Sequence, residues 1–314
     1  MKKTNRRGFL KAGSLMFGGI ALGSMIGPLY GCEGKSENDA EKEDIDSAMG
    51  DSTPAKSLSL PAFGIQLWTV KEAMAQNPKA TLEKLASYGY NQIESFDGEQ
   101  GMWWGMKPGE FASFIEDLDM KVVASHCNMK ENLEQKAAEA AEIGLTYLID
   151  PYEGPQENLA AYRKLAQDFN RYGQVCKGAG VRFAYHNHDY SFTEMEGQMP
   201  HKLFMDETDP ELVDFEMDMY WVVTAGEDPV KWLKDYAGRW KLCHIKDRMK
   251  EAPASEAQAS TQLGTGMIDY GKILSAAKEQ GMEYFIVEQE RFDNSDPLKS
   301  SEENARYMAD TYSA

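Results

Sequence analysis

The chain has 314 residues and a formal net charge of −18 at pH 7, because 51 acidic side chains outnumber 33 lysines and arginines. A protein this acidic repels the phosphate backbone of nucleic acids, so we expect no nucleic-acid partner. Three of the four cysteines lie in the body of the chain. This odd number gives no paired disulfide framework, and we interpret the three as small buried residues.

The first 32 residues have the layout of an export signal. Basic residues in MKKTNRRGFLKAG precede the apolar segment SLMFGGIALGSMIGPLYG, which is short and glycine-rich for a membrane span. The pair Arg6-Arg7 resembles a twin-arginine signal, and LYGC, ending at Cys32, resembles a bacterial lipobox. We expect a periplasmic or cell-envelope lipoprotein that meets the membrane only through a lipid on Cys32. The alternative is a plain cleaved signal in which the arginine pair occurs by chance.

Residues 33–60 are rich in acids and have almost no large apolar side chains. Such a segment cannot bury enough surface to order itself, so we predict a disordered acidic tether. One folded domain is then expected over residues 61–314, a length close to the ~250 residues of an eight-stranded α/β barrel.

From residue 61 the sequence alternates short β-rich apolar runs with longer amphipathic ones, a pattern typical of parallel strands joined by helices. The predicted strands are 63–68, 91–96, 121–126, 146–151, 181–186, 213–218, 241–246 and 284–289. The predicted helices are 80–89, 109–119, 133–144, 159–180, 228–238 and 269–281, and the helix after the fifth strand is weakly defined. Eight strands in this length favour a single-domain α/β fold, the (β/α)8 TIM barrel, over an open doubly wound sheet.

Four of the five histidines fall at the ends of these strands. In a barrel the carboxyl ends of the strands form the active-site face. The polar and aromatic residues found there are Gln66, Trp68, Glu94, His126, Asp150, His186, His188, Asp218, His244, Lys246, Glu288 and Glu290. The fifth histidine, His201, follows Pro200 at a helix start, and we interpret it as structural.

Alternate residues of a strand face the same side. Asp214, Glu216 and Asp218 therefore share one face of their strand, and His244 shares a face with Lys246. Inward polar side chains cost several kcal/mol each unless they are paired or bound. A ring of imidazoles and carboxylates at one barrel mouth indicates a divalent metal, of a kind such as Mn, Co, Fe or Zn rather than Ca. The alternative is a hydrogen-bonded polar layer that holds no metal.

Six segments together resemble the xylose-isomerase-like TIM barrels, a family grouped as sugar phosphate isomerases and epimerases. The resemblance covers essentially all of residues 61–314. The segments are FGIQLWTVKEAM, GVRFAYHNHDYSF, DFEMDMYWVVTAGEDPVKWL, LCHIKD, LGTGMIDYGKIL and YFIVEQE.

The resemblance implies one divalent metal held by Glu, Asp, His and Glu from strands five to eight. Manganese is the expected metal, with cobalt, iron, zinc and magnesium as alternatives. Asp218, His244 and Glu288 match the last three ligands, and His186 stands where the family carries the first Glu. We therefore predict His186 as the fourth ligand. Trp221 is a second departure, because epimerases of the family often carry a histidine there.

The resemblance also implies that the enzyme removes a proton next to a sugar carbonyl. Glu288 is the expected base, and His188, Lys246 and His126 are further candidates for acid–base catalysis. Trp68, Glu94 and Trp221 are expected to bind the small carbohydrate substrate. Because no glycine-rich phosphate cradle follows strands seven and eight, we expect an unphosphorylated sugar or keto-sugar, met outside the cytoplasm.

The predicted activity is isomerisation or epimerisation of that sugar. Elimination or hydrolysis of a 3-keto-glycoside by the same site is the first alternative. A non-catalytic carbohydrate-binding lipoprotein is the second, and metal content discriminates it, since a silent barrel has no need for stoichiometric metal. A related abasic-site endonuclease is disfavoured, because it needs more histidine ligands and a basic groove. No oligomeric state follows from the sequence.

Overall fold

The computed structural model describes residues 58–60, 62–293 and 295–312. The predicted signal, Cys32 and most of the predicted tether lie outside these residues. Leu60, which the sequence assigns to the tether, is buried, and its backbone N–H donates to the carbonyl of Tyr312 at 2.6 Å. The folded body therefore includes Leu60. No helix among the described residues is long and apolar enough to cross a membrane.

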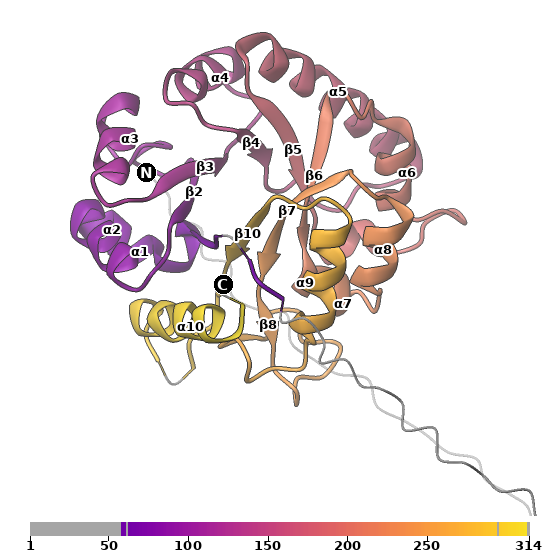
Figure 1. Ribbon diagram of the computed structural model, residues 1–314. Coiled ribbons are helices and arrows are strands. Elements are labelled where there is room, and N and C mark those ends of the chain that lie inside the picture. Colours follow the sequence, from indigo (N-terminus) through magenta and orange to yellow (C-terminus); the bar gives the residue numbers. More distant parts are fainter. Residues whose placement is uncertain (1–57, 61, 294, 313–314) are drawn as a thin grey trace, which may run out of the picture. The chain divides into compact units, whose positions relative to one another are not determined.

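Eight parallel strands close into a barrel in the order β1, β10, β7, β6, β5, β4, β3, β2, and helices surround it (Figure 1). The strands are β1 (Gly64–Gln66), β2 (Gln92–Phe96), β3 (Lys121–His126), β4 (Tyr147–Asp150), β5 (Arg182–His186), β6 (Val213–Asp218), β7 (Trp240–Ile245) and β10 (Tyr284–Val287). Each lies within its predicted run, except that β7 begins one residue earlier. The predicted single-domain TIM barrel is confirmed.

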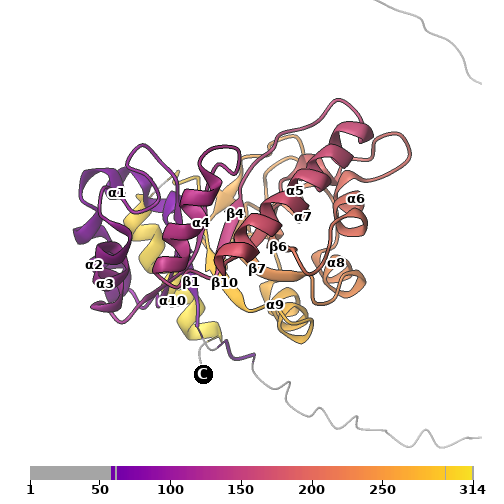
Figure 2. The same cartoon turned by 90° about the horizontal axis from the view of Figure 1, so that it is seen from above.

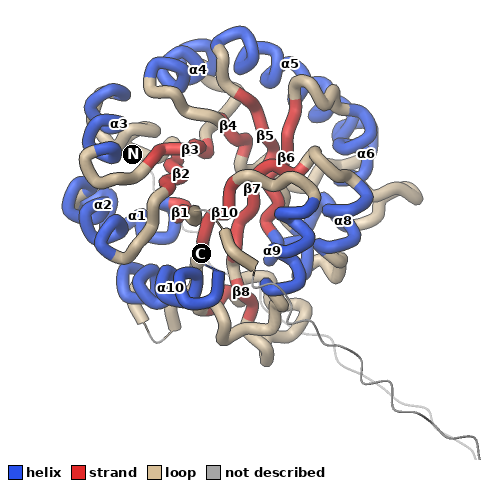
Figure 3. Tube along the Cα trace, in the orientation of Figure 1, coloured by secondary structure: helices blue, strands red, loops and turns tan. Residues whose placement is uncertain are grey.

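The helices form a ring outside the strands, as the tube in Figure 3 shows. They are α1 (Lys71–Gln76), α2 (Pro78–Ser87), α3 (Pro108–Glu116), α4 (Leu133–Glu142), α5 (Leu159–Ala179), α6 (Pro200–Glu207), α7 (Met219–Thr224), α8 (Pro229–Asp235), α9 (Tyr270–Glu279) and α10 (Pro297–Tyr312). Short 3-10 helices follow β1 (Leu67–Val70) and β5 (Asp189–Phe192), and a small hairpin pairs β8 (Asp247–Arg248) with β9 (Ser260–Thr261). The six predicted helices are present, and α6 is the weakly defined one.

Helix α5 shows how the local sequence places an element against the barrel. The Asn158 side chain accepts a hydrogen bond from the backbone of Ala161 and caps its start, and Gly180 ends it with a φ of 88°. In the middle of the helix, a Cβ on Gly173 would lie 2.3 Å from the backbone oxygen of Leu212, just before β6. The glycine therefore lets α5 lie close to this segment. Figure 2 shows α5 along the side of the barrel, next to α6.

The interior of the barrel is apolar below its carboxyl-terminal face. A buried cluster there consists of Val123, Ala124, Tyr147, Ile149, Ala184, Leu242 and Ile286. Four of these residues come two positions before a polar strand-end residue, so the polar side chains form the next layer up. The larger core lies between the strands and the helices. Cys127, Cys176 and Cys243 are buried and free, as predicted.

Candidate active site at the barrel mouth

A cavity of about 420 Å³ opens at the carboxyl ends of the strands. Its walls carry aromatic side chains, and its floor carries imidazoles, a lysine and carboxylates. The lining residues are Trp68, Phe96, Asp97, His126, Cys127, Asn128, Lys130, Asp150, Pro151, Tyr152, Glu153, His186, His188, Trp221, Lys246, Glu288 and Glu290. A cavity of this size and polarity suits a small polar molecule such as a sugar.

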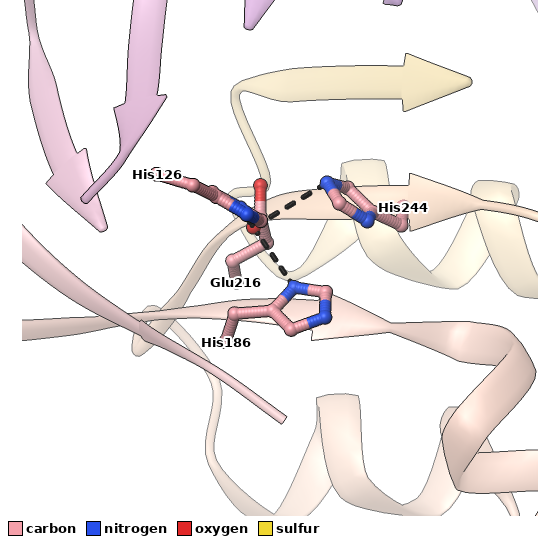
Figure 4. Close-up of side chains that lie close together, drawn as sticks. All are labelled: His126, His186, Glu216 and His244. Atoms are coloured by element: carbon pink, nitrogen blue, oxygen red, sulfur yellow. Dashed lines mark hydrogen bonds and ion pairs between the residues drawn. The ribbon is translucent and has the colours of Figure 1, made fainter. Parts of the chain in front are cut away.

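Four side chains from different strands meet at the bottom of the cavity, and we call Glu94, His126, His186 and Glu216 the deep group. Oε2 of Glu216 lies 2.8 Å from Nε2 of His126 and 3.0 Å from Nδ1 of His186. Oε1 of Glu94 lies 3.1 Å from the same His126 nitrogen. Figure 4 shows the Glu216 carboxylate among the imidazoles of His126, His186 and His244.

Three further residues, Asp218, His244 and Glu288, form a second cluster at the carboxyl ends of β6, β7 and β10, and we call them the mouth group. Glu288 lines the cavity, whereas Asp218 and His244 are buried beneath it. Nδ1 of His244 lies 3.2 Å from Oε2 of Glu288 and 3.8 Å from Oδ2 of Asp218. The other ring nitrogen of His244, Nε2, lies 2.6 Å from Oε1 of Glu94. The His244 ring therefore joins the mouth group to the deep group.

Lys246 supplies a positive charge to the mouth group. Its Nζ lies 3.2 Å from Oδ2 of Asp218, 2.9 Å from Oε2 of Glu288 and 2.6 Å from Oε2 of Glu290. The lysine side chain is 1% exposed, so these carboxylates are its main partners. The arrangement follows from strand parity, because Lys246 comes two residues after His244.

Charge sets the protonation of the deep group. Burial opposes protonation of His126, but the carboxylates of Glu94 and Glu216 outweigh it and raise its pKa to about 9. Burial and the charge of Glu94 raise the pKa of Glu216 to about 7. Burial also disfavours the charged form of Glu94, but His126 and His244 outweigh it and lower the pKa of that carboxyl. Burial, together with His244, lowers the pKa of His186 well below its usual range.

The positive charge of Lys246 affects the pKa values of the mouth group. Burial disfavours ionisation of Glu288, but Lys246 and His244 outweigh it and hold the pKa of Glu288 well below its usual range. Burial disfavours charge on Lys246, but the three carboxylates outweigh it and raise its pKa. Burial raises the pKa of Asp218 despite the nearby lysine. Glu288 is therefore an ionised carboxylate at the cavity.

His188 faces the cavity outside both groups. Burial and then Lys246 lower its pKa to about 3, so the ring is neutral near pH 7. Its Nδ1 has no hydrogen-bond partner among the described residues, and its ring lies 5.2 Å from that of Trp221. A neutral imidazole with a free nitrogen can accept or relay a proton from a bound molecule.

Most of the residues predicted from the sequence come together here. Trp68 stands at the rim with 40% of its surface exposed, 5.0 Å from the ring of Phe96. Trp221 lines the wall, and its backbone N–H donates to Asp218, which caps α7. Glu94 is buried beneath the cavity and does not line it. Its predicted contact with substrate stays a prediction. Its observed partners are the imidazoles of His126 and His244 and the side-chain amide of Gln66, which donates to Oε1 at 2.6 Å.

Sequence reasoning did not select Glu216 as a site residue, although the structure places it among three imidazoles. Strand parity in the sequence could have identified it, because Glu216 shares the inward face of β6 with Asp218. His201, interpreted as structural, lies apart from the cavity on α6, stacked at 5.1 Å on Trp240 and buried.

Two overlapping sets of donor atoms are spaced to hold a metal ion. The first consists of Asp218, His244 and Glu288, and the second of His126, His186, Glu216 and His244, with the donor atoms of each set within 4.8 Å of one another. Oδ2 of Asp218 is buried and accepts no hydrogen bond in the described structure, although it forms an ion pair with Nζ of Lys246 at 3.2 Å. Imidazole and carboxylate donors suit divalent transition metals. The mouth group therefore fits the metal that the sequence predicts. His186, the predicted fourth ligand, belongs to the second set, and its Nε2 lies 3.8 Å from Oδ2 of Asp218, the same separation as Nδ1 of His244.

Solved structures of other proteins have the same fold. A sugar phosphate isomerase/epimerase from Parabacteroides distasonis ATCC 8503 superposes with a TM-score of 0.68 at 25% sequence identity, covering 84% of this chain and 98% of that one. The IOLI protein, solved with a binding zinc atom, superposes with a TM-score of 0.65 at 16% identity, covering 80% of this chain and 97% of that one. At this identity the second likeness shows the fold alone.

Curated relatives match over shorter stretches. An inosose dehydratase of Bacillus cereus (strain AH820) is 30% identical over 141 residues, which are 41% of this chain and 47% of the relative. Another, of Clostridium perfringens (strain ATCC 13124), is 31% identical over 147 residues, which are 43% of this chain and 49% of the relative. The chain thus spans about half the length of these relatives. The family description "Xylose isomerase-like TIM barrel" matches residues 82–311. With most of the barrel covered by that match, the chain belongs to the xylose isomerase-like TIM barrel family.

Proposed function

We propose that the chain is a divalent-metal-dependent enzyme that removes a proton from the carbon next to a carbonyl of an unphosphorylated sugar or keto-sugar. The observation that carries this proposal is the mouth group, Asp218, His244 and Glu288, of which Glu288 lines a cavity of about 420 Å³. The relatives named as sugar-processing enzymes support it.

Asp218, His244 and Glu288 are the residues that would hold the metal. When bound, a divalent ion supplies a Lewis acid that stabilises negative charge on a carbonyl oxygen. His244 is oriented for this role, because its Nε2 lies 2.6 Å from Glu94 and leaves Nδ1 facing the two carboxylates. A carboxylate partner on the far nitrogen fixes the tautomer of a metal-binding histidine.

The chain's own acid–base groups lie around the same floor. Glu288 is ionised and lines the cavity, so it is the base that accepts the proton from carbon. His188 is neutral and lines the cavity, so it is the candidate to exchange a proton with the substrate. The Lys246 ammonium holds Glu288 and Glu290 in place, and its positive charge stabilises negative charge that develops nearby. His126 and His186 are the imidazoles of the deep group that line the cavity.

The charges and aromatic rings of the cavity favour a neutral carbohydrate. Among the described lining residues the lysines are Lys130 and Lys246, and both are already paired, Lys130 with Glu153 at 2.6 Å. Neither is free to bind a phosphate. Trp68 and Trp221 supply flat apolar faces on which a sugar ring can pack.

Proton removal next to a carbonyl is common to two outcomes. Protonation of the neighbouring carbon gives isomerisation, and protonation of the same carbon on its opposite face gives epimerisation; these are the first assignment. Expelling a group from the adjoining carbon gives elimination, as in lysis of a 3-keto-glycoside. The relatives named inosose dehydratase favour this second outcome as the alternative.

The proposal is tested by a substrate screen on the chelator-treated chain, with free sugars and 3-keto-glycosides, before and after Mn²⁺ is added. We expect the chelator-treated chain to be inactive. It should regain turnover of one of the two substrate classes when Mn²⁺ is added. Asp218→Asn should lower kcat/KM by about 10² or more, as losing a metal ligand or its partner does. Asp97→Asn, which alters another acid of the cavity wall, should keep the metal requirement. Equal turnover by the chelated chain contradicts the proposal, and no turnover of either class by the metal-loaded chain favours a carbohydrate-binding lipoprotein.

A further inference from the structure

Two carboxyl side chains lie together in a part of the cavity wall that the proposed reaction does not use. They are Asp150, the last residue of β4, and Glu153, and both line the cavity. Asp150 is 4% exposed, and so is the side chain of Glu153. We propose that Asp150 is a catalytic acid that gives its proton to the leaving oxygen of a keto-glycoside, and that residues 150–153 hold the leaving group. This inference rests on the proposed function and selects elimination from its outcomes.

The contacts of the two carboxyls indicate that Asp150 carries a proton. Nζ of Lys130 lies 2.6 Å from Oε2 of Glu153, so the negative charge of Glu153 is paired. The Asp150 side chain forms a hydrogen bond with that of Glu153, and its Oδ2 receives no hydrogen bond from any described residue. Two ionised carboxylates have no hydrogen to share, so one of the pair must be protonated. The lysine lies on Glu153, which places the proton on Asp150.

The surroundings of Asp150 favour this protonated form. Burial, and then the carboxylate of Glu153, raise the pKa of Asp150 well above its ordinary value. Four other titratable side chains act on it from the loop after β3, from α5, from β5 and from the 3-10 helix after β5. They are Cys127, Tyr172, Tyr185 and Tyr190, whose own pKa values are raised, so they are uncharged near pH 7. A carboxyl kept protonated by its environment is what a general acid at a glycosidic oxygen requires.

The topology of the barrel separates this acid from the base. Glu288 directly follows β10, and three strands lie between β10 and β4 whichever way the closed barrel is followed. Glu288 and Asp150 therefore belong to opposite sides of the barrel, although both line the same cavity. A sugar that presents its acidic carbon to Glu288 has its far substituent on the side of Asp150.

An aromatic ring next to Asp150 is available to the leaving group. Tyr152 is 58% exposed, and it and Trp68 are the exposed large aromatic side chains among the described residues. Both line the cavity. The backbone that carries Tyr152 is fixed, because the N–H groups of Glu153 and Gly154 donate to the hydroxyl of Tyr190 at 3.2 and 3.1 Å. A fixed, exposed aromatic face suits stacking with a second sugar or an aromatic aglycone.

The proposed step is balanced without any oxidant or reductant. Glu288 takes the proton from the carbon next to the carbonyl, and the electron pair of that C–H bond forms a double bond to the adjoining carbon. The bond from the adjoining carbon to the bridging oxygen breaks, and its electron pair goes to that oxygen, which takes the proton of Asp150. The products are an unsaturated keto-sugar and a free alcohol. Exchange with water then returns a proton to Asp150 and removes one from Glu288.

Leaving groups of different acidity test the role of Asp150. A 4-nitrophenolate leaves without help from an acid, whereas methoxide needs a proton, so the metal-loaded full chain is assayed with methyl and 4-nitrophenyl 3-keto-glycosides of one sugar. Asp150→Asn should lower kcat for the methyl compound by about 10² or more and for the 4-nitrophenyl compound far less. Asp97→Asn, another acid of the cavity wall, is the matched control and should not separate the two substrates.

Two further variants test the neighbours of Asp150. In the wild type, kcat for the methyl compound should fall as pH rises through the pKa of Asp150, because the donor loses its proton. Glu153→Gln removes the adjacent carboxylate, lowers that pKa and should move the fall to lower pH; it replaces Asp150→Asn if that variant does not fold. Tyr152→Ala should raise KM for a 3-keto-disaccharide by roughly 2–10-fold relative to the methyl compound.

Deuterium exchange separates failure of this inference from failure of the proposed function. Equal losses for both leaving groups in Asp150→Asn, or no loss for either, would overturn the role of Asp150 as acid. A chain that exchanges the proton next to the carbonyl but expels no group from any keto-glycoside would also overturn it, while the proposed function stands. A metal-loaded chain without exchange or turnover would refute both.

Discussion

A single buried histidine outside the cavity, His201, links burial to acid sensitivity. Its ring stacks on Trp240 and on Phe192, with centroids 5.1 and 4.6 Å away. Ser191 Oγ lies 3.2 Å from its Nδ1, and Nε2 has no partner among the described residues. Burial lowers the pKa of His201 to about 3. A histidine in the unfolded chain has a pKa of about 6.5. Between these two pKa values His201 therefore binds a proton in the unfolded chain but not in the folded chain.

The sign of this effect gives a prediction. Above pH 6.5 both states are neutral at His201, and as pH falls toward 3 the unfolded state is increasingly favoured. Between pH 7 and 5 the free energy of unfolding should fall by about 2 kcal/mol more in the wild type than in His201→Gln. Urea titrations of both proteins at the two pH values measure this difference. Equal losses in both proteins would show that His201 is protonated in the folded state.

Site residues were predictable one by one, but their grouping was not. Strand ends and parity pointed to His126, His186, Asp218 and His244, and all of them reach one floor. The same parity contained Glu216, which was not selected as a ligand. Which nitrogen of an imidazole faces which carboxylate depends on side-chain rotation and on the stagger of the barrel strands. A sequence pattern carries neither.

At the scale of elements, Gly173 and Gly178 of α5 form a matched pair. A Cβ at Gly173 would lie 2.3 Å from the Leu212 oxygen, whereas a Cβ at Gly178 would meet nothing within 4 Å. Gly173→Ala should lower the free energy of unfolding by about 1–3 kcal/mol, because the backbone must move apart. Gly178→Ala should raise it by up to about 1 kcal/mol through helix propensity. Denaturant unfolding of the two variants checks this, and equal effects would show that α5 does not press on the segment before β6.

Strands were easier to predict than the short helices. Each barrel strand is a compact apolar run bounded by polar or glycine residues, so its limits are visible in the sequence. Helix α7 was missed, because Met219–Thr224 continues directly from β6 and its apolar residues MYWVVT show no break. Helix α10 was missed, because PLKSSEENARYMADTY buries only a few side chains and reads as polar. The Asp218 side chain caps α7, and α10 packs against the barrel through buried residues such as Ala305 and Met308.

For the whole molecule, closure of the barrel turns separate strand ends into one site. Residues as far apart as Glu94 and His244 become neighbours at 2.6 Å. The length, the alternation of elements and the family resemblance predicted this closure. The cavity walls depend on the loops after the strands, whose paths the repeating pattern does not fix. The barrel topology was therefore predictable, although not every helix, and the cavity only at its floor.

Proton exchange with solvent tests the central claim most directly. A sugar or keto-sugar that the enzyme turns over is incubated in deuterated water with the metal-loaded chain, with the chelated chain and with Glu288→Gln. We predict deuterium at the carbon next to the carbonyl with the loaded wild type, none above background with the chelated chain, and a rate lower by about 10² or more in Glu288→Gln, as loss of a general base implies. Turnover without any deuterium incorporation would mean that hydrogen moves within the substrate. It would contradict proton removal by Glu288.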